Sequence, residues 1–283
     1  MPDQADRGPA SRGPAGGPTT GGPGGIAIPR PPAAQRIRAA LSFVLVAGLA
    51  LIAYRQVDFN LEALFTGTAD FVGFLGRLAP DWSYLPAIWP PLIETLQIAY
   101  IGTFFGTVLA IPLIFLASAN TASNGVSMWI ARFLLTILRS IPDLLWAAIL
   151  VPILVVGPLP GAIALTLFSI GILAKLGSET VESIDPGPME ALRAAGAGRI
   201  ATIVYAVVPQ VAATMVSYIL YIFEINVRAS VIIGYVGAGG IGFLLQVRLN
   251  FFDYSAVGLI IVAIFAVVLI IDGVSVWARS RLI

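Results

Sequence analysis

Long stretches of this chain contain no charged residue and consist mainly of apolar residues. A helix needs about 20 residues to cross the hydrocarbon layer of a bilayer, because each residue advances it by about 1.5 Å. Two stretches, 95–131 and 144–174, are too long for a single span, and each contains a turn-forming segment, ANTASNG at 119–125 and GPLPG at 157–161. The pattern therefore predicts six membrane-spanning helices, near 38–55, 89–117, 140–157, 161–177, 201–228 and 254–277.

The composition supports an all-α polytopic membrane protein. Hydrophobic residues make up 58% of the 283 residues and charged residues 11%, against about 45–50% and 25% in a soluble domain. The absence of cysteine and histidine excludes disulfides, Cys/His metal sites and imidazole-dependent catalysis. A net charge of +1 gives no indication of a nucleic-acid partner. Alternatives are a membrane-embedded enzyme, which the scarce acids disfavour, and an ion-coupled transporter or channel, for which no inverted repeat is visible.

The chain divides into three predicted regions. Residues 1–35 are rich in Gly and Pro and are predicted to form a disordered cytoplasmic tail. Residues 36–88 hold the first transmembrane helix and an external segment, and 89–283 form the main transmembrane domain. Arginines gather before the first span, around the loop 177–200 and after the last span. Because positive residues favour the cytoplasmic side, we expect both termini in the cytoplasm of a bacterium, with the chain in its inner membrane.

The loop 177–200 is predicted to contain a short helix. Pro186-Gly187-Pro188 interrupts the preceding helix, so a new one can begin close to Met189. Glu190 then lies in the first turn, where the helix dipole stabilises a carboxylate. Gly196 can end this helix, since glycine readily adopts the left-handed conformation that follows a helix. Its small alanine side chains would let another surface approach the backbone closely.

The segment 190–209 consists of Glu190-Ala191-Leu192, three residues, Gly196, nine residues and then Ala206-Val207-Val208-Pro209. This pattern resembles the EAA signature of bacterial ABC-importer permeases. Leu192, Ala206 and Val208 depart from the usual Ala, Ile and Leu, while the spacing is intact. The resemblance implies a type I ABC-importer fold and a coupling helix that docks onto a separate ATP-binding subunit. An ordinary capped loop helix is the alternative. The implied coupling residues are Glu190, Ala191, Leu192, Ala195 and Gly196.

A narrower resemblance, to phosphonate-importer permeases, rests on Arg139-Ser140-Ile141-Pro142, on FEINVRAS at 223–230 and on GAGGIG at 237–242. It implies import of a phosphonate, phosphate or phosphite by alternating access. It also implies two ATP-binding subunits and an extracytoplasmic substrate-binding protein. Because one six-span chain rarely encloses a path alone, we predict a homodimer with the path on its two-fold axis. The related methionine-importer permeases share some of these elements, so an amino-acid substrate is the alternative. No G-x-x-x-x-G-K-[ST] motif occurs, so ATP and Mg²⁺ are expected on the partner ATPase and no cofactor on this chain.

Ionisable residues within spans are expensive and usually line a path or pair with one another. Glu224 and Arg228 are four residues apart and face the same way on a helix. Arg228 either contacts an oxyanion, because its planar guanidinium can bind a pair of oxygens, or only pairs with Glu224 to tether the fifth span to the glycine-rich loop. Arg139 and Asp143 are a second such pair. They either bind each other in a structural role or contact the ATPase side. Asn226 and Ser230 complete the predicted path on the fifth span.

The glycines from Gly237 to Gly242 satisfy the dinucleotide-binding pattern G-x-G-x-x-G. No predicted strand precedes them, and no acid lies about 20 residues later, so that interpretation is rejected. A re-entrant external loop is predicted instead, which a membrane tolerates only where protein or a cavity surrounds it. Gly237, Gly239 and Gly240 would then form a gate, or else a plain tight turn.

Overall fold

The computed structural model describes residues 33–57 and 67–281, and within these ranges every regular element is helical. The chain forms two compact units, Met1–Thr66 and Gly67–Ile283. In the first unit, α1 (Ala33–Gln56) exposes its apolar side chains and is long enough to cross a membrane, which matches the predicted first span. The predicted disordered tail lies outside the described residues up to residue 32.

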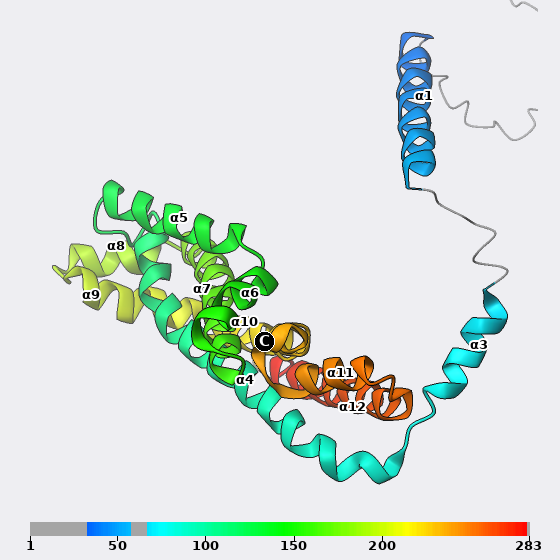
Figure 1. Ribbon diagram of the computed structural model, residues 1–283. Helices are drawn as coiled ribbons and strands as arrows, with labels where there is room; N and C mark the ends of the chain where they lie inside the picture. The colour runs from blue at the N-terminus through cyan, green and yellow to red at the C-terminus, as the bar shows by residue number, and fades with distance from the viewer. Residues whose placement is uncertain (1–32, 58–66, 282–283) are drawn as a thin grey trace, which may run out of the picture. The chain divides into compact units, whose positions relative to one another are not determined.

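The second unit is a bundle built around α4, α7 and α10 (Figure 1). Residues 67–88, which the sequence analysis grouped with the first span, belong to this unit, where α3 packs against α12. Its helices are α3 (Thr68–Arg77), α4 (Leu85–Ala117), α5 (Gly125–Ser140), α6 (Asp143–Leu154), α7 (Pro158–Glu182), α8 (Gly187–Ala194), α9 (Arg199–Thr202), α10 (Val208–Ile233), α11 (Gly240–Asn250) and α12 (Tyr254–Arg279).

Five helical segments of the described chain are long and apolar enough to span a membrane, and a bent pair could make a sixth. The predicted third span, near 140–157, contains one helix, α6, which is shorter than expected. Helices α5 and α6 meet just before it at 83°, and α6 has 12 residues, about 18 Å, too short to cross alone. Pro142 separates them; the residue before a proline is pushed out of the helical conformation. Only the two helices together could make the sixth span.

Small residues bring α4 and α7 together. A Cβ atom added at Gly102 would lie 2.5 Å from Leu165 Cβ, and one at Gly106 would lie 2.4 Å from Ser169 Cβ. The two glycines are four residues apart, so they lie on one face of α4. Membrane helices commonly pack through such small residues, since backbones can then approach closely. This contact fixes the centre of the bundle on which α10 packs.

Helix α10 lies between a π-helical turn and a kinked turn. The first, Ile203–Val207, joins it to α9, and the second, Gly234–Ala238, leads through a sharp bend into α11. Within the second turn Gly237 has φ +100°, and Gly239 and Gly240 follow with φ +82° and +70°. Only glycine adopts such values without strain, so the bend depends on the glycine run that the sequence singles out.

Candidate coupling helix and polar pathway

Helix α8 has one buried side and one exposed side. Met189 is 3% exposed and joins the core cluster that includes Val181 and Val207, and the partly buried Leu192 packs against the same cluster. Glu190, Ala191 and Ala195 are exposed. The outer face of α8 therefore offers one carboxylate and small side chains. Leu192, expected among the coupling residues, instead holds α8 on the bundle.

The C-terminal end of α8 confirms the predicted role of Gly196 in ending the helix. Gly196 has φ +82°. Its N–H donates to Arg193 O at 3.0 Å, and the Ala197 N–H donates to Leu192 O at 2.9 Å. These two bonds form a Schellman motif, which satisfies carbonyls that the helix itself leaves unpaired. The helix begins at Gly187, slightly before the expected start, because a proline in the first turn needs no N–H partner.

Two arginines bind α8 and α9 to the loop 118–124 that follows α4. Arg193, in the last turn of α8, donates to Asn120 O at 3.1 Å, and Arg199, in α9, donates to Thr121 O at 2.8 Å. The loop is also bound to the end of α7, where Asn120 Nδ2 donates to Val181 O at 2.6 Å. Sequence reasoning missed these contacts, since residues 73 and 78 positions apart leave no local pattern.

The predicted pairing of Glu224 with Arg228 is confirmed, with Arg228 Nη2 lying 2.6 Å from Glu224 Oε1. Arg279, near the end of α12, reaches the other oxygen, Glu224 Oε2, at 3.3 Å. Two guanidinium groups thus share one carboxylate that is 9% exposed, leaving a net positive charge. Arg279 was missing from the predicted path, because nothing in the sequence links the end of α12 to α10.

Asn226 lies on the opposite side of α10 and is completely buried. Its Nδ2 donates to Thr103 Oγ1 of α4 and to Ser169 Oγ of α7, both at 2.8 Å. Ser230 is buried as well and donates to Val227 O at 2.8 Å within α10. These two predicted path residues therefore contact other helices or their own backbone, and Asn226 joins the three central helices.

We expect Asn226→Leu to lower the stability of the permease by about 1 kcal/mol, because Thr103 and Ser169 lose their shared donor and hydrogen bonds between membrane helices contribute amounts of this order. Thermal unfolding of the purified protein in detergent measures the change. Gln97→Leu on α4 is the control, since Gln97 has no side-chain hydrogen bond among the described residues. Equal unfolding temperatures for both variants would contradict the bridging role of Asn226.

The glycine run packs tightly against α4 and the start of α7. A Cβ at Gly239 would lie 2.9 Å from Glu94 Oε1, and one at Gly240 would lie 2.4 Å from Thr95 Oγ1. Thr95 Oγ1 accepts a hydrogen bond from the Ile241 N–H at 2.7 Å. The Gly157 N–H donates to Gly237 O at 3.0 Å. The expected close packing of this segment is present, with three helices meeting at the bend.

Arg139 lies against α7, where its Cγ is 3.0 Å from the position of a Cβ at Gly171. It forms no ion pair with Asp143, whose carboxylate accepts instead from the Leu144 N–H at 2.9 Å. The bend between α5 and α6 separates the two side chains, so the expected four-residue pair does not form. Arg139 is thus an arginine without an ion-pair partner in the described ranges.

Comparison with known proteins decides the family. A family model described as "Binding-protein-dependent transport system inner membrane component" matches residues 110–282. The chain belongs to this family. This permease is therefore a multi-pass inner-membrane transport protein, and its region of match includes α8, α10 and the glycine run.

Curated relatives of this permease come from several bacteria. The phosphate-import permease protein of Mycolicibacterium smegmatis is 39% identical over 248 residues, which are 87% of this chain and 46% of that protein. The phosphite transport system permease protein of Stutzerimonas stutzeri is 37% identical over 82% of this chain and 85% of that protein. The chain thus spans under half of the first relative and most of the second.

A solved structure shares the fold of this permease. An inward-facing methionine ABC transporter structure contains a chain with a TM-score of 0.63 and 20% identity, over 72% of this permease and 99% of that chain. At this identity the likeness establishes the architecture of a type I ABC-importer permease and nothing about the ligand.

Proposed function

We propose that this chain is the membrane subunit of an ATP-driven importer of phosphorus oxyanions, meaning phosphate, phosphite or phosphonate. The observation that carries the coupling role is the two-sided α8, anchored by Met189 and exposing Glu190 and Ala191. Relatives that are named as phosphate-import and phosphite permeases, at 39% and 37% identity, support the substrate class over methionine.

The proposed assembly is a homodimer with two ATP-binding subunits and an extracytoplasmic substrate-binding protein. One bundle of this size leaves no enclosed path by itself, and a two-fold axis would create one between two copies. ATP and Mg²⁺ would be bound by the partner subunits, which dock on the outer face of α8 at Glu190, Ala191 and Ala195. Gly196 holds the end of that helix. The proposed orientation has α8 and both chain termini in the cytoplasm.

The substrate pathway would combine positively charged side chains with a bend that acts as a gate. Arg228 and Arg279, held by Glu224, present positive charge that attracts an oxyanion. The bend at Gly237, Gly239 and Gly240 would act as the gate, since a segment rich in glycine absorbs changes in backbone angles when rigid helices move. Asn226 and Ser230 would keep α10 in register while it moves.

Uptake by the reconstituted complex tests this proposal. The permease, its ATP-binding subunits and its binding protein would be placed in proteoliposomes with radiolabelled phosphate outside and ATP inside. We expect uptake that requires ATP and that unlabelled phosphite or methylphosphonate suppresses, while methionine does not. Uptake driven by an ion gradient without ATP would refute the ATP-driven class. Suppression by methionine alone would refute the substrate class.

A further inference from the structure

A polar groove of about 280 Å³ lies between α5 and α7. The two helices run antiparallel there, because Arg132 contacts Glu182 while Arg139 lies against Gly171, which is nearer to the start of α7. Its charged and hydroxyl side chains are Arg132, Thr136 and Arg139 from α5, with Lys175, Ser178, Glu179 and Glu182 from α7.

The groove carries a net positive charge. Lys175 Nζ lies 2.8 Å from Glu179 Oε1, and Arg132 Nη2 lies 2.5 Å from Glu182 Oε1. The third cation, Arg139, has no such partner among the described residues. A free guanidinium beside an ammonium offers a set of donors that suits the oxygens of a tetrahedral oxyanion.

The groove is open to ligands from outside the chain. Side chains of Arg132, Lys175 and Glu179 are 48%, 44% and 54% exposed. Five ionised groups on one surface cannot face lipid without a large cost, so they line water or another protein. Along α7 the lining runs from Lys175 to Glu182, the last residue of the helix. These residues span about 10 Å, so the groove covers the last two turns of α7.

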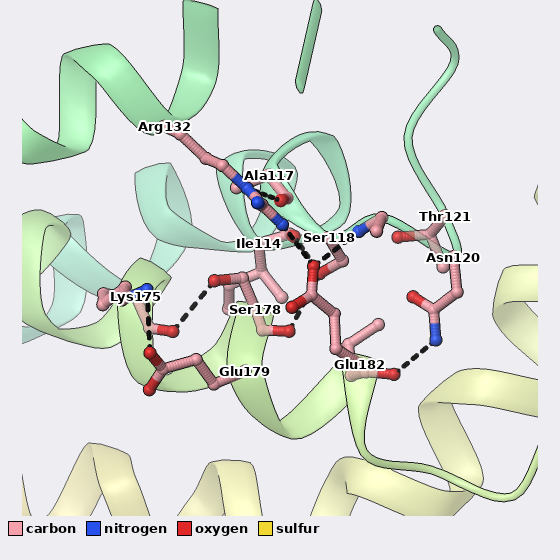
Figure 2. Close-up of polar contacts among 12 residues, drawn as sticks. Ile114, Ala117, Ser118, Asn120, Thr121, Arg132, Lys175, Ser178, Glu179 and Glu182 are labelled. Carbon is pink, nitrogen blue, oxygen red and sulfur yellow. Dashed lines mark hydrogen bonds and ion pairs between the residues drawn. The ribbon is translucent and has the colours of Figure 1, made fainter. Parts of the chain in front are cut away.

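Glu182 connects this groove to the loop 118–124 that follows α4 (Figure 2). Its Oε1 accepts from the Ala119 N–H at 2.6 Å as well as from Arg132. Ala119 belongs to the loop 118–124, which Arg193 of α8 and Arg199 of α9 hold through its carbonyls. A displacement of α8 therefore pulls on the loop whose backbone fixes Glu182, and a carboxylate that shifts toward or away from Arg132 changes the positive charge available in the groove.

We propose that this groove binds the phosphorus oxyanion before its release to the cytoplasm, with Arg139 and Lys175 contacting its oxygens and Glu182 competing for Arg132. The identity of the anion rests on the proposed function. In the structure Glu182 is paired with Arg132, so Arg139 and Lys175 are the cations that hold the anion, and a movement of α8 that draws Glu182 away would add Arg132 to them and tighten binding. The groove is separate from the Glu224 cluster on α10 and provides a second anion site on the inner half of the path.

Cysteine labelling tests binding directly, because the chain contains no cysteine. In the assembled permease–ATPase complex in detergent, without ATP, Thr136→Cys would react with a negatively charged methanethiosulfonate reagent. We expect inorganic phosphate to slow labelling by at least about fivefold, relative to chloride at equal ionic strength. Val126→Cys, exposed on α5 outside the groove, is the matched control. Phosphate that slows neither site, or both equally, would overturn the proposal.

Removing the free guanidinium provides the second test. Arg139→Gln should abolish phosphate protection of Thr136→Cys and lower phosphate uptake per ATP hydrolysed by about tenfold, and Arg139→Lys should restore part of both. Arg77→Gln on α3 is the control with an exposed arginine elsewhere. Full uptake by Arg139→Gln would overturn the proposal, and so would a parallel loss of uptake and ATP hydrolysis. Failure of the proposed function is recognised separately, since the unaltered complex would then show no ATP-driven phosphate uptake.

Discussion

Glu190→Ala is expected to abolish ATP-driven uptake by the reconstituted complex, lowering the rate by at least about thirtyfold, since a charged residue at the centre of a protein contact often contributes 2 kcal/mol or more. Glu190 is exposed in the first turn of α8, and its side chain forms no hydrogen bond or ion pair among the described residues. Its removal therefore leaves the fold of the permease intact and weakens only the docking of the ATP-binding subunit.

Two measurements separate docking from folding for this variant. Co-purification of the ATP-binding subunit with the permease should fall with uptake, while thermal unfolding of the permease alone stays unchanged. Asp272→Asn on α12 is the matched control, an acid without a hydrogen-bond or ion-pair partner in the described part of the chain, and should support normal uptake. If Glu190→Ala transports phosphate at the rate of the unaltered protein, the assignment of α8 as the coupling helix is wrong.

Gly242→Ala is expected to cause a large loss of stability of this permease. A Cβ at this position would lie 2.0 Å from Val231 O and 2.9 Å from Tyr235 N. Both atoms belong to the backbone, so no side chain can rotate to relieve the overlap. Overpacking of this kind costs about 3 kcal/mol, which corresponds to a fall of about 10 °C in the unfolding temperature for a domain of this size.

Gly273→Ala on α12 is the control for the glycine substitution. No atom lies within 4 Å of a Cβ there, and alanine is the better helix former, so the unfolding temperature should stay equal or rise slightly. Thermal unfolding of both purified variants in one detergent, followed by size-exclusion chromatography, provides the comparison. If the Gly242→Ala protein has the same unfolding temperature as the Gly273→Ala protein, α10 and α11 separate easily at this bend.

Local patterns in the sequence predicted much of this structure. The apolar stretches located the long helices, the four-residue spacing predicted the Glu224–Arg228 pair, and Gly196 marked the end of α8. Each of these features depends on residues within one or two helical turns, where geometry alone fixes which side chains meet.

Other features depend on contacts between distant segments and escaped prediction. Hydropathy located the apolar residues of 140–157 but not the 83° angle between α5 and α6, because a hydropathy pattern gives the length of an apolar stretch and not its direction. The pairing of Arg132 with Glu182 and of Arg279 with Glu224 joins residues 50 and 55 positions apart. Asn226 looked like a path residue because polarity within a span indicates function, yet packing turned it toward α4 and α7.

The irregular turns at the two ends of α10 have a mechanical consequence. A π-helical turn forms hydrogen bonds five residues apart, so it accommodates one more residue than an α-helical turn of the same height. The turn at Ile203–Val207 is of this kind, and the turn at Gly234–Ala238 is kinked at Gly237. Both turns would bend while the helix between them stays intact, so α10 would tilt as one rigid body together with α4 and α7, to which Asn226 joins it.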